Sequence, residues 1–304
     1  MDTISLSHIL YTNASLEDNP FDDPFIKRLD DWPEHITNGI EKWTSNLKPL
    51  DKLQKMANPP SAVFAYMCFK YHVCLATIFP KFISDTRGRS ASLTHVLVTY
   101  INEDADPNVH IMALAEHAKT FTIPPVSNNE RFTEYEQLYT KGLKLNLPTS
   151  NSIHTGLKNQ SKEQVLDVVK AAYRTTQRSS NYNLNVPDIP TLMDSLAICG
   201  MALPPRWRLH FYWGCGAASI NRQANIITRE IAGNQPPPQQ IDQGLHTYLD
   251  KLWQALEQYP NNNKGAKRFL DTIWGIDANP EMVSEGWGIN SLEGLFEWSK
   301  GIKI

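Results

Sequence analysis

The stretch SAVFAYMCFKYHVCLATIF, residues 61–79, is the longest apolar run of the chain. It follows Pro59 and Pro60, and proline is favoured where a helix begins. Lys70 and His72 interrupt the run, so no segment has the ~18 uninterrupted apolar residues that a membrane-spanning helix needs. We therefore predict a buried helix over residues 61–79 and no membrane partner.

Apolar residues recur at helical spacing in much of the rest of the chain. Residues 36–43 carry Ile, Ile and Trp on one predicted helical face. Residues 92–101, SLTHVLVTYI, fit either a buried helix or a strand. Ser161 and Gln164 form an S-x-x-Q capping box at the start of another helix. Further helices are predicted over residues 107–119, 132–139, 161–173, 190–200, 217–232, 245–256 and 264–274.

These elements together predict a mainly α fold. Predicted helices outnumber strands, and the chain lacks the alternation of strand and helix that an α/β sheet requires. The polar, turn-rich residues 147–160 indicate a boundary between two lobes. The expected architecture is a bilobed helical protein with extended N- and C-terminal arms. Its predicted parts are an N-terminal arm (1–32), an N-terminal helical lobe (33–150), a C-terminal helical lobe with a basic face (151–285) and a C-terminal arm (286–304).

The two arms are candidates for self-association. The N-terminal arm is acidic and is broken by Pro20 and Pro24 after a short apolar segment. The C-terminal arm is apolar, and exposing it to water would cost about 25 cal/mol per Å². Each arm either packs on its own body or reaches another subunit. The residues expected to mediate a homo-oligomer are Ile4, Ile9, Leu10, Leu292, Leu295, Phe296 and Trp298.

The formal net charge of −3 hides a segregation of charge along the sequence. Residues 1–40 contain eight acidic and two basic residues, whereas residues 141–230 contain eleven basic and five acidic ones. Such segregation indicates a site for a polyanion or a self-association surface.

Basic and aromatic residues of the middle region are candidates for binding RNA. Lys170, Arg174 and Arg178 recur every four residues on one predicted helix, at steps of about 6 Å that suit the phosphates of a strand. A second predicted helix carries Arg222 and Arg229 opposite its apolar face. Between the two helices lies a strip of basic and aromatic residues, from which we select Arg206, Trp207, Arg208 and Tyr212. The alternative is that the charges are solvated and the aromatic rings are buried.

The sequence GCGAAS, residues 214–219, suggests a different function. An apolar run, G-x-G-x-x-S and a predicted helix resemble the dinucleotide-binding turn of Rossmann-type proteins. That turn would imply a nucleotide-dependent enzyme. The chain departs from the pattern because Ser219 replaces the third glycine and no acidic residue follows at the ribose position.

Metal and catalytic patterns are weak. Cys68 and His72 would share a helix face near Cys74, but apolar neighbours favour buried thiols and a buried histidine over a metal site. The four cysteines match no common zinc spacing and suggest a reducing compartment. The N-terminus lacks the basic start of a signal peptide. We expect no metal, no cofactor, no enzymatic activity and a cytoplasmic location.

In overall build the predicted chain resembles the nucleoproteins of segmented negative-strand RNA viruses. That resemblance implies a compact bilobed protein that holds single-stranded RNA in a basic cleft and polymerises through exchanged arms. It implies a role in coating and encapsidating a viral genome, with single-stranded RNA, further copies of the chain and a viral polymerase as partners, in the host cytoplasm and the virion. The alternatives are the nucleotide-dependent enzyme and a helical scaffold protein that does not bind nucleic acid.

Overall fold

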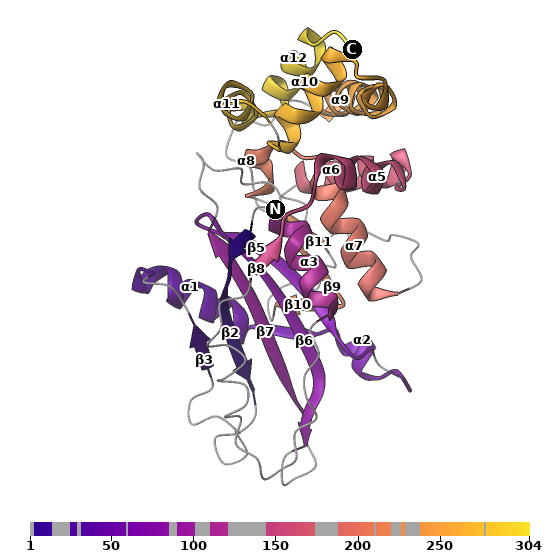
Figure 1. Ribbon diagram of the computed structural model, residues 1–304. Helices are drawn as coiled ribbons and strands as arrows, with labels where there is room; N and C mark the ends of the chain where they lie inside the picture. The colour runs from indigo at the N-terminus through magenta and orange to yellow at the C-terminus, as the bar shows by residue number, and fades with distance from the viewer. Residues whose placement is uncertain are drawn as a thin grey trace.

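The computed structural model describes residues 3–13, 25–28, 32–58, 60–84, 90–100, 110–120, 144–173, 188–209, 211–219, 226–228, 238–276 and 278–304. These residues form a mixed α and β structure in which helices cover an antiparallel sheet (Figure 1). The prediction of a mainly α, bilobed helical protein with extended arms is therefore wrong.

The sheet has seven strands within the described residues, in the order β11-β9-β5-β6-β7-β2-β3. Every neighbouring pair is antiparallel. The strands are β2 (Ser7–Thr12), β3 (Phe25–Arg28), β5 (Val63–Phe69), β6 (His72–Ser84), β7 (Ser90–Tyr100), β9 (Phe211–Cys215) and β11 (Ile226–Thr228). Two smaller pairs join β1 (Thr3–Ser5) to β8 (Lys144–Asn146) and β4 (Leu47–Pro49) to β10 (Ala217–Ser219).

The run predicted as one helix, residues 61–79, instead forms the hairpin of β5 and β6. Its residues alternate between the two faces of the sheet, as strand geometry requires. Phe64 and Tyr66 belong to one hydrophobic core, whereas Val63 and Ala65 belong to a second core on the opposite face. Because helices cover both faces, the strand shows no polar side and its alternation is invisible in the sequence.

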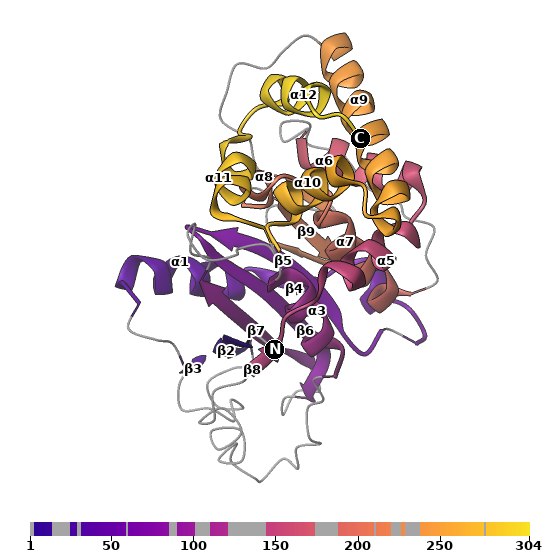
Figure 2. The ribbon, with the colours of Figure 1, turned by 45° about the horizontal axis from the view of Figure 1, so that its top comes forward.

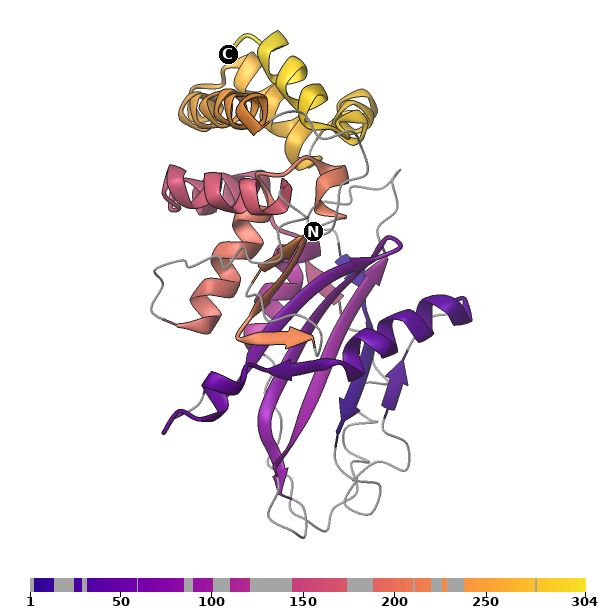
Figure 3. The same cartoon turned by 180° about the vertical axis from the view of Figure 1, so that it is seen from behind.

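The helices lie on both sides of this sheet. Helix α1 (Glu34–Ser45) covers one face, where Ile36 and Ile40 complete the second core (Figure 3). Helices α3 (His110–Thr120) and α7 (Ile189–Gly200) cover the other face, as Figure 1 shows. The other described helices between β4 and β9 are α2 (Asp51–Gln54), α5 (Ser150–Lys158), α6 (Lys162–Tyr173) and α8 (Pro205–Arg208).

The C-terminal quarter of the chain is a group of packed helices (Figure 2). They are α9 (Pro238–Gln258), α10 (Lys264–Trp274), α11 (Pro280–Gly288) and α12 (Leu292–Gly301), with a single 3₁₀ turn at Tyr259–Asn261. Leu292 and Leu295 of α12 are buried in the core shared with α9 and α10. The predicted C-terminal arm thus packs on its own chain, because burying its apolar face removes that face from water.

The predicted N-terminal arm is likewise part of the body where it is described. Strand β2 pairs with β7 on one side and β3 on the other. Ile9 and Leu10 are buried on opposite sides of this strand and are at most 1% exposed. The predicted lobe boundary at residues 147–160 contains α5, which Thr149 and Ser152 cap reciprocally. Residues that suit a turn also suit a helix cap, which explains why a helix begins in this turn-rich stretch.

Several predicted helices are confirmed by the structure. Helix α10 spans residues 264–274 as predicted, and α1 includes residues 36–43. In α6 the Ser161 hydroxyl accepts from the Gln164 N–H at 3.1 Å, and the Gln164 side chain accepts from the Ser161 N–H at 2.9 Å. Across the described residues, no helix combines the length and the apolar character that a membrane span requires.

Candidate nucleic-acid interface

The strip of basic and aromatic residues at 204–213 lies mostly in the core. Trp207 and Trp213 are at most 1% exposed, and the Trp213 ring stacks on Tyr66 of β5 with centroids 5.4 Å apart. The prediction that Trp207 stacks on RNA bases is therefore wrong, because its ring already packs against protein. Its large apolar surface explains the burial.

Arg208 is also buried, at 6% exposed, and its guanidinium donates to backbone carbonyl groups. Nε donates to the Leu203 oxygen at 2.8 Å, and Nη2 donates to the oxygens of Met201 and Ile273. Two of these acceptors follow the C-terminus of α7, where a cation is favourable. Arg208 therefore serves the fold, and the prediction that it contacts RNA phosphates is wrong.

The other described residues of the predicted RNA site occupy three different settings. Arg206 is exposed on α8, and Lys170 is half-buried on α6. Tyr212 is half-buried on β9, where its hydroxyl accepts from the Trp43 indole N–H at 3.1 Å. These residues therefore lie on three different elements, α8, α6 and β9.

Four predicted RNA-binding arginines lie outside the described residues: Arg174, Arg178, Arg222 and Arg229. The helix predicted over residues 217–232 is contradicted at both described parts, which form β10 and β11. Strand β11 pairs with β9, and its isoleucines match a strand as well as a helix.

The predicted dinucleotide turn is likewise absent. Gly214 pairs with Ala65 inside the sheet, and residues 217–219 form β10 where a Rossmann-type turn would begin a helix. Gly216 has a positive φ of 75°, and a Cβ there would come within 2.8 Å of the Leu53 and Ile189 side chains. Close packing and turn geometry thus account for this glycine, and the dinucleotide interpretation loses its structural basis.

The residues predicted to mediate self-association also differ in how far they are buried. Ile9, Leu10, Leu292 and Leu295 are buried within the chain, as described above. Phe296 and Trp298 are half-buried on α12, where the Trp298 indole N–H donates to Glu285 at 3.0 Å. Ile4 lies in β1, and its side chain is outside the described residues.

One aromatic surface was not predicted, and it lies at the end of the β5–β6–β7 sheet. Phe69, His72 and Tyr100 face each other across these three strands, with His72 paired to both neighbours. Trp32 packs edge-on against His72 at 4.7 Å between centroids. Tyr71, at 38% exposed, lies in the adjacent turn, and Tyr100 is 55% exposed. We call this set, with Lys70 of the turn, the aromatic edge: Trp32, Phe69, Lys70, Tyr71, His72 and Tyr100.

Strand lengths explain why the aromatic edge is open. Strand β2 begins at Ser7, whose partner on β7 is Val98. Strand β7 continues to Tyr100, which pairs only with β6 among the described strands. The ring of Tyr100 therefore contacts only the tilted ring of His72, at 5.1 Å between centroids, among the ring contacts of the described residues, and Tyr100 is 55% exposed.

The turn of the β5–β6 hairpin has an unusual backbone. Its two central residues, Lys70 and Tyr71, have positive φ angles of 45° and 67°. Two-residue hairpin turns favour this conformation, but they normally place Asn or Gly there because other side chains are strained. Such strain costs about 1–2 kcal/mol per residue and is typical of functional sites. Lys70 is exposed, with Nζ 5.9 Å from the Phe69 ring centre.

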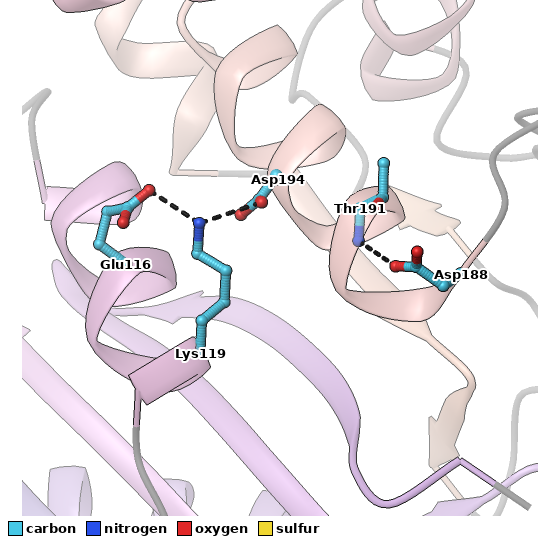
Figure 4. Close-up of polar contacts among 5 residues, drawn as sticks. All are labelled: Glu116, Lys119, Asp188, Thr191 and Asp194. Atoms are coloured by element: carbon cyan, nitrogen blue, oxygen red, sulfur yellow. Dashed lines mark hydrogen bonds and ion pairs between the residues drawn. The ribbon is translucent and has the colours of Figure 1, made fainter.

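An ion-pair cluster joins α3 to α7 near the other face of the sheet (Figure 4). Lys119 contacts Glu116 at 2.9 Å and Asp194 at 3.1 Å. Burial opposes the charge of Lys119, but its hydrogen bonds to the two carboxylates outweigh burial and raise its pKa. A lysine held in its charged form is no nucleophile, so this cluster links two helices. Nearby, the Asp188 carboxylate caps α7 by accepting from the Thr191 N–H at 2.8 Å.

Buried histidines and thiols occupy the core. His8 and His95 stack at 5.5 Å and share a ring-nitrogen contact of 3.2 Å. Burial lowers the pKa of His95 well below its usual value, and His8 and His117 lower it further. Burial raises the pKa of Cys199 to about 12, which keeps that thiol protonated and unreactive. Within the described parts of the chain, no three His, Cys, Asp or Glu residues are grouped to hold a metal ion.

A sequence signal for the aromatic edge was present but weak. The motif Phe-Lys-Tyr-His, residues 69–72, divides the longest apolar run near its middle. A polar break of this kind suits a hairpin turn between two buried strands. The missing Asn or Gly concealed it.

The chain matches no protein-family model, no curated protein and no solved structure.

Proposed function

We propose that the protein binds single-stranded RNA, with unpaired bases stacking on the aromatic edge. The observation that carries this proposal is the exposure of Tyr71 and Tyr100 beside an exposed lysine at the end of a sheet. Proteins that bind single-stranded RNA commonly present aromatic rings from a sheet, because the faces of unpaired bases stack on them.

The energetics of stacking suit this surface. Each base stacked on an aromatic side chain contributes about 1–3 kcal/mol, almost independently of its identity. A duplex does not offer base faces along its length, so the aromatic edge favours single strands. Phosphate contacts would come from Lys70 and from the basic residues of the middle region, including Arg206 and Lys170.

The proposal is limited to RNA binding by one chain. Coating a viral genome, which the resemblance to nucleoproteins implies, also requires contacts between copies. Four of the residues predicted for those contacts are buried in the core of their own chain, as described above. We therefore do not assign self-association to the two terminal segments.

Binding of fluorescently labelled RNAs of unrelated sequence tests the proposal. We expect measurable affinity at low salt and a steep loss as the salt concentration rises, because phosphate binding releases counterions. Tyr71→Ala and Tyr100→Ala should each weaken binding about 5- to 150-fold, the loss of one stacked base. Met56→Ala is the matched control, since Met56 is an exposed apolar residue outside the aromatic edge at 51% exposed.

A second measurement addresses the charges. Charge reversal at Arg174, Arg178 and Arg222 together should abolish binding if the basic middle region follows the RNA backbone. The ratio of absorbance at 260 and 280 nm in the purified protein reports any co-purifying nucleic acid. The proposal is refuted if the protein has no measurable affinity for RNA at low salt, or if both tyrosine variants bind like the Met56→Ala control.

A further inference from the structure

The side chain of His72 contacts the strained turn directly. Its Nδ1 lies 2.9 Å from the carbonyl oxygen of Lys70. A carbonyl oxygen only accepts, so Nδ1 carries the proton and donates this hydrogen bond. The acceptor belongs to Lys70, the first of the two residues with positive φ.

The setting of His72 favours this role. The ring is 6% exposed and is held between Trp32, at 4.7 Å edge-on, and Tyr100, at 5.1 Å. Burial lowers the pKa of His72, with the hydrogen bonds to the backbone of Lys70 and Phe69 acting in the opposite direction. The groups that face His72 are two aromatic rings and the backbone of Lys70 and Phe69, and no carboxylate of the described residues forms an ion pair with it. The neutral ring with its proton on Nδ1 is therefore the favoured form.

From this geometry we infer that His72 is a positioning residue, which holds Lys70 and Tyr71 in the left-handed turn and so fixes the Tyr71 ring for base stacking. Loss of this hydrogen bond removes one interaction that offsets the backbone strain, so the turn opens more readily toward ordinary φ values. The Tyr71 ring then leaves the position that the turn gives it. The inference about RNA rests on the proposed function, whereas the inference about the turn does not.

Two substitutions separate the hydrogen bond from ring packing. His72→Phe keeps an aromatic ring but removes the donor. His72→Asn loses the ring but places an N–H₂ donor close to the position of Nδ1. Cleavage by chymotrypsin after Tyr71, mapped by mass spectrometry on the folded full-length chain, measures opening of the turn. We expect faster cleavage in His72→Phe and cleavage near the original rate in His72→Asn.

RNA affinity should follow the same order. We expect His72→Phe to bind about tenfold more weakly, the typical worth of one hydrogen bond, and His72→Asn to bind within about threefold of the original chain. Lys70→Asn added to His72→Phe should restore both the resistance to cleavage and much of the affinity, because Asn tolerates positive φ. Lys70→Asn alone is the control for loss of the lysine charge.

Each outcome decides the inference. If His72→Phe leaves cleavage after Tyr71 unchanged, or if His72→Asn is cleaved as fast as His72→Phe, then His72 does not act through its hydrogen bond and the inference is wrong. A chain that binds no RNA would refute the proposed function, while the cleavage rates would still test the turn. Should His72→Phe fail to fold, His72→Asn and Lys70→Asn keep the test open: rapid cleavage in folded His72→Asn contradicts the inference.

Discussion

Two aromatic regions of this chain differ from what their sequences suggest, one as a binding surface and the other as core. Residues 204–213, rich in arginine and tryptophan, resemble a binding surface but form part of the core. Residues 61–79 resemble pure core, but the middle of this run forms an exposed turn. The difference lies in the hydrogen bonds, because Arg208 is bonded to carbonyl groups of the protein whereas Lys70 extends to solvent.

Whether a side chain is buried therefore depends on whether nearby backbone groups need a hydrogen-bond partner. An arginine next to the free carbonyls of a helix C-terminus is drawn into the protein. A tyrosine in a two-residue turn is left outside, whatever the hydrophobicity of the flanking strands. Four predictions, taken from the largest expected effect on stability to the smallest, test this contrast.

Arg208→Ala should produce the largest loss. It removes a buried cation and leaves carbonyl oxygens of Leu203, Met201 and Ile273 without this donor. We expect the free energy of unfolding to fall by about 3–5 kcal/mol, measured by chemical denaturation. Arg206→Ala, two residues earlier and exposed, is the control and should change stability by less than about 0.5 kcal/mol. If both variants lowered the free energy of unfolding equally, Arg208 would not differ from the exposed Arg206 in its contribution to the core.

Gly216→Ala should come second. The new Cβ would approach Leu53, Val63 and Ile189 within 2.9 Å, on a backbone with a φ of 75°. Crowding and backbone strain together should cost about 2–3 kcal/mol in the same denaturation experiment. Gly301→Ala is the control, because a Cβ there meets nothing within 4 Å. A tolerated alanine at residue 216 would show that Leu53, Val63 and Ile189 pack loosely around this glycine.

Acid should destabilise the core through its histidines. The pKa of His95 is lowered in the folded state by burial first and by His8 and His117 next. The unfolded chain, with a pKa near 6.5, binds the proton more readily, so stability is full above that pH and decreases below it. The slope is at most about 1.4 kcal/mol per pH unit for each such histidine.

Denaturation between pH 7.5 and 5 measures this effect. His95→Asn should flatten the profile, and His246→Asn, at an exposed position of α9, is the control. A profile that is equally steep in both variants would place the acid sensitivity elsewhere.

Tyr71→Ser and Tyr100→Ser should have the smallest effect on folding. Each side chain is more than one-third exposed, so we expect a change within about 0.5 kcal/mol, measured by thermal unfolding. Phe69→Ser is the contrast, because Phe69 lies under Gly39 of α1 and supports that helix. A large loss of stability from either tyrosine variant would mean that the aromatic edge belongs to the core.

The sequence predicted the helices that have a polar side and clear caps. Helices α6 and α10 are amphipathic and begin with side-chain caps, so their periodicity and ends were visible. Strands β5 and β6 were missed because helices cover both faces and no polar residue marks the alternation of period two. Strand β11 was missed because its isoleucines suit strand and helix equally.

The candidate site was harder to predict than the fold. Arg208 and Trp207 were chosen for their chemistry, and only tertiary contacts show that the chain itself satisfies that chemistry. Tyr100 is exposed because β2 begins at Ser7 and leaves the end of β7 open. The open position beside Tyr100 depends on the relative lengths of two strands about ninety positions apart in the chain. No local sequence pattern reports these relative lengths.

The guanidinium of Arg208 has a consequence for how the molecule unfolds. It binds carbonyl groups that follow α7, which packs on the sheet, and also one at the end of α10 in the C-terminal helices. Tyr248 of α9 adds a hydrogen bond to Ala202 in the same segment. Separating the helices from the sheet would leave these buried groups without partners, so neither part opens alone at low cost. We therefore expect the sheet and the C-terminal helices, which share one hydrophobic core, to unfold together, with Arg208 as one link between them.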